Sequence, residues 1–162
     1  MKKRLLIVGA GQHGHVVAET AKAIGWASIS FLDDHCQEAV GKLKDLEEIS
    51  KQYDGVVVSI GDNKTRQNIL QRLEICEVPV VSIIHPRAFI SPTAKIGRGS
   101  IILPGATVHT NSMIGDGCIL SIGALVDHNT VVGSFCHIDT GAVIGAGKQV
   151  ASTEYVDAGS IV

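Results

Sequence analysis

The sequence predicts a protein of two parts, a small α/β unit over residues 1–83 followed by a three-sided parallel β-prism over residues 84–162. In the first part, short apolar runs alternate with amphipathic stretches, which is typical of parallel strands joined by helices. A glycine-rich turn follows the first apolar run, at the place where such sheets bind ligands. In the second part, a large aliphatic residue returns every six positions.

The α/β unit begins with an apolar run at residues 4–8 that predicts a buried strand. An amphipathic pattern then predicts a helix to about residue 24, where Gly25 ends it. Further strands are predicted at residues 27–32 and 55–60, and helices at residues 43–52 and 63–74, the second of which starts at a capping residue. This alternation predicts a small parallel sheet with right-handed crossovers.

The turn after the first strand reads Gly9-Ala10-Gly11-Gln12-His13-Gly14, a G-x-G-x-x-G pattern that opens a helix. Its backbone N–H groups and the helix dipole favour phosphate, and glycine lets a ligand approach the backbone. An acidic pair, Asp33 and Asp34, ends the second strand, where a carboxylate can bind a ribose. Three strands are half of a dinucleotide fold, so a nucleotide diphosphate fits better than NAD. A tight turn without a ligand is the alternative.

The second part repeats with a period of six, which fits neither a helix, with a period near 3.6, nor a plain strand, with a period of 2. A short strand and a turn fit it, three to a coil, with the aliphatic residue inside and a small residue at the corner four positions later. Accidental periodicity in a β-rich domain is the alternative. The repeated aliphatic residues are Ile84, Ile90, Ile96, Ile102, Val108, Ile114, Leu120, Val126, Val132, Ile138, Ile144, Val150, Val156 and Val162.

Composition excludes several classes of function. The net charge is −2 and aromatic residues make up 4% of the chain, so neither a basic surface nor a stacking platform for nucleic acid is expected. The apolar run at residues 5–10 is too short to span a membrane and lacks a cleavage site, so we expect no membrane association and no signal peptide. The four cysteines show no CxxC spacing, and Cys118 and Cys136 should stack as reduced thiols, which favours a cytoplasmic protein.

The motifs GAGQHG, FLDD and SIGDN, joined by IHPRAFISPTAKIG to six-residue repeats, resemble those of the bacterial hexapeptide-repeat nucleotide-sugar acyltransferases. The most similar branches are the UDP-4-amino-sugar N-acetyltransferases of bacillosamine synthesis and the sialic acid O-acetyltransferases. The resemblance implies a half-Rossmann domain followed by a left-handed parallel β-helix, acetyl-CoA as acyl donor, and a homotrimer with active sites between subunits. It also implies a set of residues that contact the sugar nucleotide: Gly11, Gln12, His13, Asp33, Asp34 and Gly61.

Acyl transfer to an amine or hydroxyl needs a base, and histidine is suited to that role near neutral pH. By resemblance His128 is the general base, and His137, nine residues later, binds acetyl-CoA near its carbonyl. Asn129 stands where the family has the carboxylate that orients the base, and Asp127 can supply a charge only at longer range. Ala158 occupies another position that the family uses for coenzyme A. Gln12 replaces a glycine of the family.

Three functional hypotheses follow. The first is acetyl-CoA-dependent N-acetylation of the 4-amino group of a UDP-amino-sugar, and the second is O-acetylation of a sialic acid or related sugar. The third is a non-catalytic or impaired nucleotide-sugar-binding protein, which Asn129 favours, as does a prism that we expect to be shortened at its C-terminus. A metal is not expected, because His109, His128 and His137 lack the spacing of the zinc ligands in related carbonic anhydrases.

Overall fold

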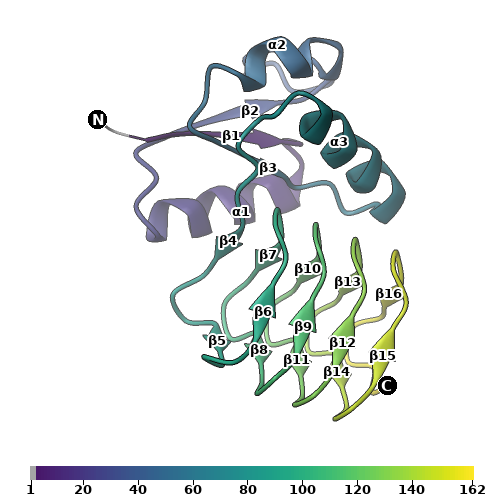
Figure 1. Ribbon diagram of the computed structural model, residues 1–162. Coiled ribbons are helices and arrows are strands. Elements are labelled where there is room, and N and C mark those ends of the chain that lie inside the picture. The colour runs from purple at the N-terminus through teal and green to yellow at the C-terminus, as the bar shows by residue number, and fades with distance from the viewer. Residues whose placement is uncertain (1–2) are drawn as a thin grey trace.

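The computed structural model describes residues 3–162, which form a three-stranded α/β unit lying over one face of a β-prism (Figure 1). The sheet is parallel, with strand order β2-β1-β3. The elements of the unit are β1 (Arg4–Val8), α1 (Gln12–Ala23), β2 (Ser28–Leu32), the 3₁₀ turn η1 (Leu43–Asp45), α2 (Leu46–Ser50), β3 (Gly55–Val58) and α3 (Asn63–Ile75). Among residues 3–162, no helix combines the length and apolar character that crossing a membrane requires.

The predicted elements are present, with shifted ends. The helix expected over residues 43–52 is a 3₁₀ turn followed by a short α2, and carboxylates bind the backbone N–H groups at its start. Asp34 Oδ1 accepts a hydrogen bond from the Leu43 N–H at 2.8 Å, and Asp45 accepts one from the Lys42 N–H at 3.4 Å. Asp62 caps α3, accepting a hydrogen bond from the Thr65 N–H at 2.8 Å. Such caps satisfy N–H groups that the first helical turn leaves unpaired.

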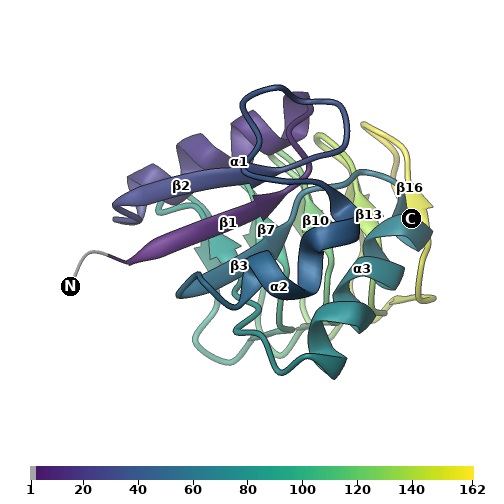
Figure 2. The same ribbon diagram turned by 90° about the horizontal axis from the view of Figure 1, so that it is seen from above.

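The two faces of the sheet have different partners, because successive side chains of a strand point to opposite faces. Leu6 and Val8 of β1 pack with buried residues of α2 and α3. Leu5 and Ile7 pack with residues of α1 and with Ile101 of the prism. Figure 2 shows the sheet from above, with the prism strands behind it and α3 beside the later coils. One face of the sheet is therefore shared by α1 and the prism.

The prism has three parallel sheets, in the order β16-β13-β10-β7-β4, β14-β11-β8-β5 and β15-β12-β9-β6. We call these the first, second and third prism faces. Neighbouring strands pair in register between residues eighteen apart, such as Leu120 and Ile138. The strands are β4 (Ile83–Ile84), β5 (Phe89–Ile90), β6 (Lys95–Ile96), β7 (Ile101–Ile102), β8 (Thr107–Val108), β9 (Met113–Ile114), β10 (Ile119–Leu120), β11 (Leu125–Val126), β12 (Val131–Val132), β13 (His137–Ile138), β14 (Val143–Ile144), β15 (Gln149–Val150) and β16 (Tyr155–Val156).

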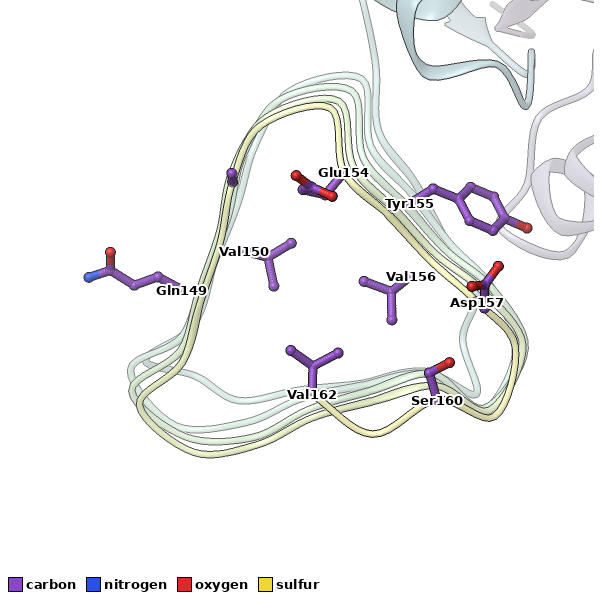
Figure 3. A pocket seen from close by; sticks show the side chains of 9 residues that line it. Gln149, Val150, Glu154, Tyr155, Val156, Asp157, Ser160 and Val162 are labelled. Atoms are coloured by element: carbon purple, nitrogen blue, oxygen red, sulfur yellow. The ribbon is translucent and has the colours of Figure 1, made fainter.

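The interior follows the sixfold pattern. Figure 3 looks along the axis at the last coil, where Val150, Val156 and Val162 point into the triangle while Gln149 and Tyr155 point outward. This end of the interior is an open hollow of about 460 Å³. Fully buried small residues occupy the corners of the inner coils: Ser100, Ala106, Ser112, Cys118, Ala124, Thr130, Cys136 and Ala142. The predicted fold class, a half-Rossmann unit followed by a left-handed parallel β-helix, is confirmed.

The first prism face carries the α/β unit. Its outward-pointing column starts with Ile83, Ile101 and Ile119, all fully buried against β1, β3 and α1. The same column continues with His137 and Tyr155, paired in register in β13 and β16. The α/β unit therefore covers the early coils with aliphatic contacts and meets the later coils through polar and aromatic side chains.

Candidate active site

The glycine turn leads into the N-terminus of α1. Gly9 has φ +102°, and a Cβ on Gly14 would collide with the carbonyl oxygen of Gly9, so both positions require glycine. Gly11 is the N-cap of α1 and provides no side-chain hydrogen bond, and the first turn of α1 holds no acidic residue. The leading N–H groups of α1 and its positive dipole end are consequently available to an anion.

A cavity of about 290 Å³ opens in front of this turn. A Cβ added to Gly11 or Gly61 would meet nothing within 4 Å, so the backbone on both sides is open to a ligand. We call this cavity the glycine-turn pocket. It is lined by Gly9, Gly11, Gln12, His13, Leu32, Asp33, Leu43, Ser59, Ile60 and Gly61. Five of the six predicted sugar-nucleotide residues therefore surround one cavity.

The sixth predicted residue, Asp34, lines a neighbouring pocket and binds the backbone of Leu43. Asp33 is also engaged with the backbone: its Oδ2 accepts from the Ala10 N–H at 2.8 Å, and its Oδ1 accepts from the His35 N–H at 2.8 Å and from the Cys36 N–H at 3.0 Å. These hydrogen bonds, that from Ala10 above all, lower the pKa of Asp33. The acidic pair shapes the loops around the pocket, a function that the motif alone does not reveal.

His13 lies on the wall of the pocket and faces His137 of the prism, with 6.3 Å between the ring centroids. His13 Nε2 and His137 Nδ1 are buried and have no hydrogen-bond partner among residues 3–162. Burial lowers the pKa of His13 to about 4, and repulsion from His137, when it is protonated, and from the Arg66 guanidinium adds to this effect. Burial also lowers the pKa of His137, against the opposing carboxylate of Asp139. Both imidazoles are therefore neutral at neutral pH.

His137 belongs to a polar network on the first prism face. Its Nε2 is 3.0 Å from Ser121 Oγ and 3.9 Å from Asp139 Oδ1. Tyr155 packs edge-on against its ring at 4.8 Å and donates a hydrogen bond of 2.6 Å to Asp139 Oδ2. This bond lowers the pKa of Asp139 and raises that of Tyr155 to about 12. Sequence reasoning missed Ser121, Asp139 and Tyr155, although Tyr155 lies eighteen residues after His137 and so belongs to the same column.

Arg66 of α3 joins the two parts beneath the pocket. Its side chain is fully buried, yet it pairs with no carboxylate among residues 3–162. Instead the guanidinium donates hydrogen bonds to six oxygens. Three belong to the α/β unit: Ile60 O (2.8 Å), Gly61 O (3.1 Å) and Asn63 Oδ1 (2.6 Å). The other three belong to the prism: Gly117 O (2.7 Å), Phe135 O (3.0 Å) and Cys136 O (3.2 Å). Burial lowers the pKa of Arg66 to about 10, so it remains charged at neutral pH. No sequence signal marked this residue.

His128 lies elsewhere, at the exposed corner between the second and third prism faces. Asn129 Nδ2 is 2.9 Å from His128 Nδ1, while Asp127 Oδ1 accepts from the His128 backbone N–H at 2.6 Å. The ring of His109 lies 6.2 Å from that of His128. Among residues 3–162, no group of three or more His, Cys, Asp or Glu side chains is placed to hold a metal ion.

The predicted site residues thus fall into three places. The spacing of nine between His128 and His137 is half a coil, so the two side chains leave different sides of the prism. His137 lies with the predicted sugar-nucleotide residues, whereas His128, Asn129 and Asp127 lie at the corner opposite the α/β unit. Ala158 is exposed on the turn that follows β16. Within one protomer, His137 therefore lies close to the glycine turn, through His13, and His128 does not.

Comparison with known proteins accounts for both parts of the chain. Residues 4–73 match the family described as PglD N-terminal domain. A UDP-N-acetylbacillosamine N-acetyltransferase of Bacillus subtilis (strain 168) is 29% identical over 108 residues, or 60% of this chain and 50% of the relative. This chain therefore spans about half the length of that curated relative.

Two solved structures match almost the whole chain. The acetyltransferase domain of PglB from Neisseria gonorrhoeae FA1090 superposes with a TM-score of 0.89 at 32% identity, covering 99% of this chain and 91% of that one. A variant of perosamine N-acetyltransferase from Caulobacter crescentus, in complex with CoA and GDP-perosamine, gives a TM-score of 0.86 at 27% identity, covering 98% and 87%. The chain belongs to the hexapeptide-repeat nucleotide-sugar acetyltransferases, the family of the PglB acetyltransferase domain.

Proposed function

We propose that this protein is an acetyl-CoA-dependent N-acetyltransferase acting on the 4-amino group of a UDP-linked amino-sugar. The observation that carries the proposal is the match over 99% of the chain to the acetyltransferase domain of PglB, which has also been solved with acetyl-CoA, combined with the glycine-turn pocket. In this proposal the pyrophosphate binds the N-terminus of α1, between the open backbones of Gly11 and Gly61. The pocket residues predicted from the sequence hold the nucleotide.

The chemistry then depends on His128. The amine nitrogen attacks the thioester carbonyl carbon, a C–N bond forms and the C–S bond breaks. His128 takes the proton from the amine and passes it to the leaving thiolate, so charge and protons balance. Asn129 orients the ring, and Asp127 holds the backbone of the corner. Acetyl-CoA supplies the activated acetyl group, with His137 and Ala158 proposed as its contacts.

We further propose a homotrimer. Because His128 lies at the corner opposite the protomer's own glycine-turn pocket, only a neighbouring subunit can bring the two together. Apolar side chains exposed on the second and third prism faces favour side-by-side packing of prisms: Phe89, Met113 and Val131. A cytoplasmic location stays a prediction.

The test is a panel of UDP- and GDP-linked 4-amino-sugars incubated with acetyl-CoA, with free thiol measured by a colorimetric reagent and the product by mass spectrometry. Release of thiol together with an N-acetylated sugar supports the proposal. Acetylation of a hydroxyl sugar alone would instead assign O-acetylation. Tight sugar-nucleotide binding without thiol release would assign the non-catalytic function, which the contact of Asn129 Nδ2 with His128 Nδ1 favours.

A further inference from the structure

Two asparagines stack at the corner that carries His128. Asn111 and Asn129 are eighteen residues apart and have φ +59° and +55°, a left-handed conformation that asparagine tolerates better than most residues. Asn111 Nδ2 donates a hydrogen bond to Asn129 Oδ1 at 3.3 Å, and Asn129 Nδ2 contacts His128 Nδ1 at 2.9 Å. The equivalent residue of the next coil is Gly147, which has no side chain. The row of amides therefore ends at Asn129, whose Nδ2 faces the His128 ring.

The direction of the amide row determines where the imidazole carries its proton. An amide nitrogen only donates, so a ring nitrogen that faces Asn129 Nδ2 must accept, and the proton of the neutral ring is then on Nε2. If both amides turn by 180°, Asn129 Oδ1 accepts from His128 Nδ1–H and the lone pair of Nε2 becomes free. A base that acts through Nε2 requires this second arrangement.

The other described neighbours of His128 form no hydrogen bond with its ring nitrogens. The Asp127 carboxylate accepts from the His128 backbone N–H. The His109 ring contacts the His128 ring at 6.2 Å with an interplanar angle of 59°, and no hydrogen bond joins them. Among the described residues, only Asn129 forms a hydrogen bond with the His128 ring, and Asn111 is the side chain that orients the amide of Asn129.

We propose that Asn111 is a positioning residue which, through Asn129, selects the ring nitrogen of His128 that carries the proton. In the arrangement observed here the row holds the proton on Nε2, and reversal of the row makes His128 a base. The consequence for rate rests on the proposed acetyltransferase function, whereas the consequence for the tautomer does not.

Asn111→Asp provides the decisive variant, because an ionised carboxylate only accepts hydrogen bonds. Asn129 Nδ2 then turns to the new carboxylate, and Asn129 Oδ1 turns to His128. In the intact protein, 15N-histidine NMR reports the tautomer from the two ring-nitrogen shifts. The expected result is a threefold to tenfold rise in the Nδ1–H fraction, roughly the factor that one net hydrogen bond is worth, with a kcat that rises by a similar factor.

Two control variants distinguish a tautomer change caused by the reversed amide from one caused by the added charge or by a change in the backbone. Thr110→Asp adds the same charge one residue away, at a side chain that makes no hydrogen bond within residues 3–162, and should leave the tautomer ratio unchanged. Asn111→Gly removes the amide and keeps the left-handed backbone, as glycine does at Gly123 and Gly147. It frees Asn129 to turn and should give a ratio between those of the wild type and Asn111→Asp.

An unchanged tautomer ratio in both Asn111→Asp and Asn111→Gly would overturn the proposal. A changed ratio with an unchanged kcat, in a protein that does turn over, would overturn the link to rate. A changed ratio in a protein that never releases thiol would leave the role of Asn111 standing and refute the proposed function.

Discussion

Replacing Arg66 by methionine tests how the two parts of the chain are held together. The substitution keeps a long side chain and removes all six hydrogen bonds of the guanidinium, three of which cross the junction to Gly117, Phe135 and Cys136. The Cys136 carbonyl keeps a bond from the Ile119 N–H, but the Gly117 carbonyl and Asn63 Oδ1 lose their partner in buried surroundings. Two buried acceptors left unpaired cost about 2–6 kcal/mol together, and part of this cost is offset because a charge is no longer buried, so the expected loss is about 2–4 kcal/mol.

Such a loss is large for a domain whose total stability is about 5–15 kcal/mol, and it should lower Tm by roughly 4–16 °C. Urea unfolding followed by circular dichroism measures the total, and the fluorescence of Trp26, which packs at the junction, follows the α/β unit. Arg72→Met is the matched control, because Arg72 pairs with Glu47 at 2.7 Å near the surface, where a salt bridge contributes about 0–1 kcal/mol. If Arg66→Met loses no more stability than Arg72→Met, the junction does not depend on this guanidinium.

Three further predictions concern the site. Gly14→Ala should lower Tm by several degrees because its Cβ meets the Gly9 carbonyl, whereas Gly11→Val should leave Tm unchanged and raise the KM for the sugar nucleotide at least tenfold; equal Tm values would contradict the clash. The pKa of His13 is about 4 in the folded protein and near 6.5 in the unfolded chain, so the unfolded chain binds the proton more tightly. The contribution of His13 to the free energy of unfolding should be fully present above pH 6.5 and should fall by about 3 kcal/mol as the pH drops to 4. Urea midpoints should show this loss, and His13→Gln should reduce it, although the lowered pKa of His137 acts in the same direction. His128→Gln should lower kcat about 100-fold or more with little change in sugar-nucleotide binding by calorimetry, and a normal kcat would exclude it as the base.

The fold of the prism could be predicted from the sequence because the six-residue pattern that specifies it is local and repeated in every coil. Each coil buries one aliphatic residue per face and needs a small residue at each corner, so every hexad carries the same information. The glycine-turn pocket was predictable for a similar reason, since Gly9 and Gly14 are required by the backbone itself. The period also predicts which side chains point outward.

The period does not predict which face the α/β unit covers, because that depends on contacts between residues far apart in the chain. His137 and His128 both point outward, and only the docking of the unit on the first prism face buries one and leaves the other exposed. The role of Arg66 could not be predicted for the same reason. It lies in an ordinary amphipathic helix, and its partners are backbone carbonyls that carry no side-chain signature.

In the proposed trimer, each active site combines the glycine-turn pocket of one protomer with His128 of another. The test mixes Gly11→Val, which has a blocked pocket, with His128→Gln, which lacks the base, and lets the subunits exchange. Thiol release is measured at a sugar-nucleotide concentration below the wild-type KM, where each variant alone should release little thiol. With random assembly at equal amounts, about a quarter of the sites should pair an intact pocket with an intact His128, and thiol release should return to about that fraction of the wild-type rate. No recovery of thiol release from mixed oligomers would contradict the claim.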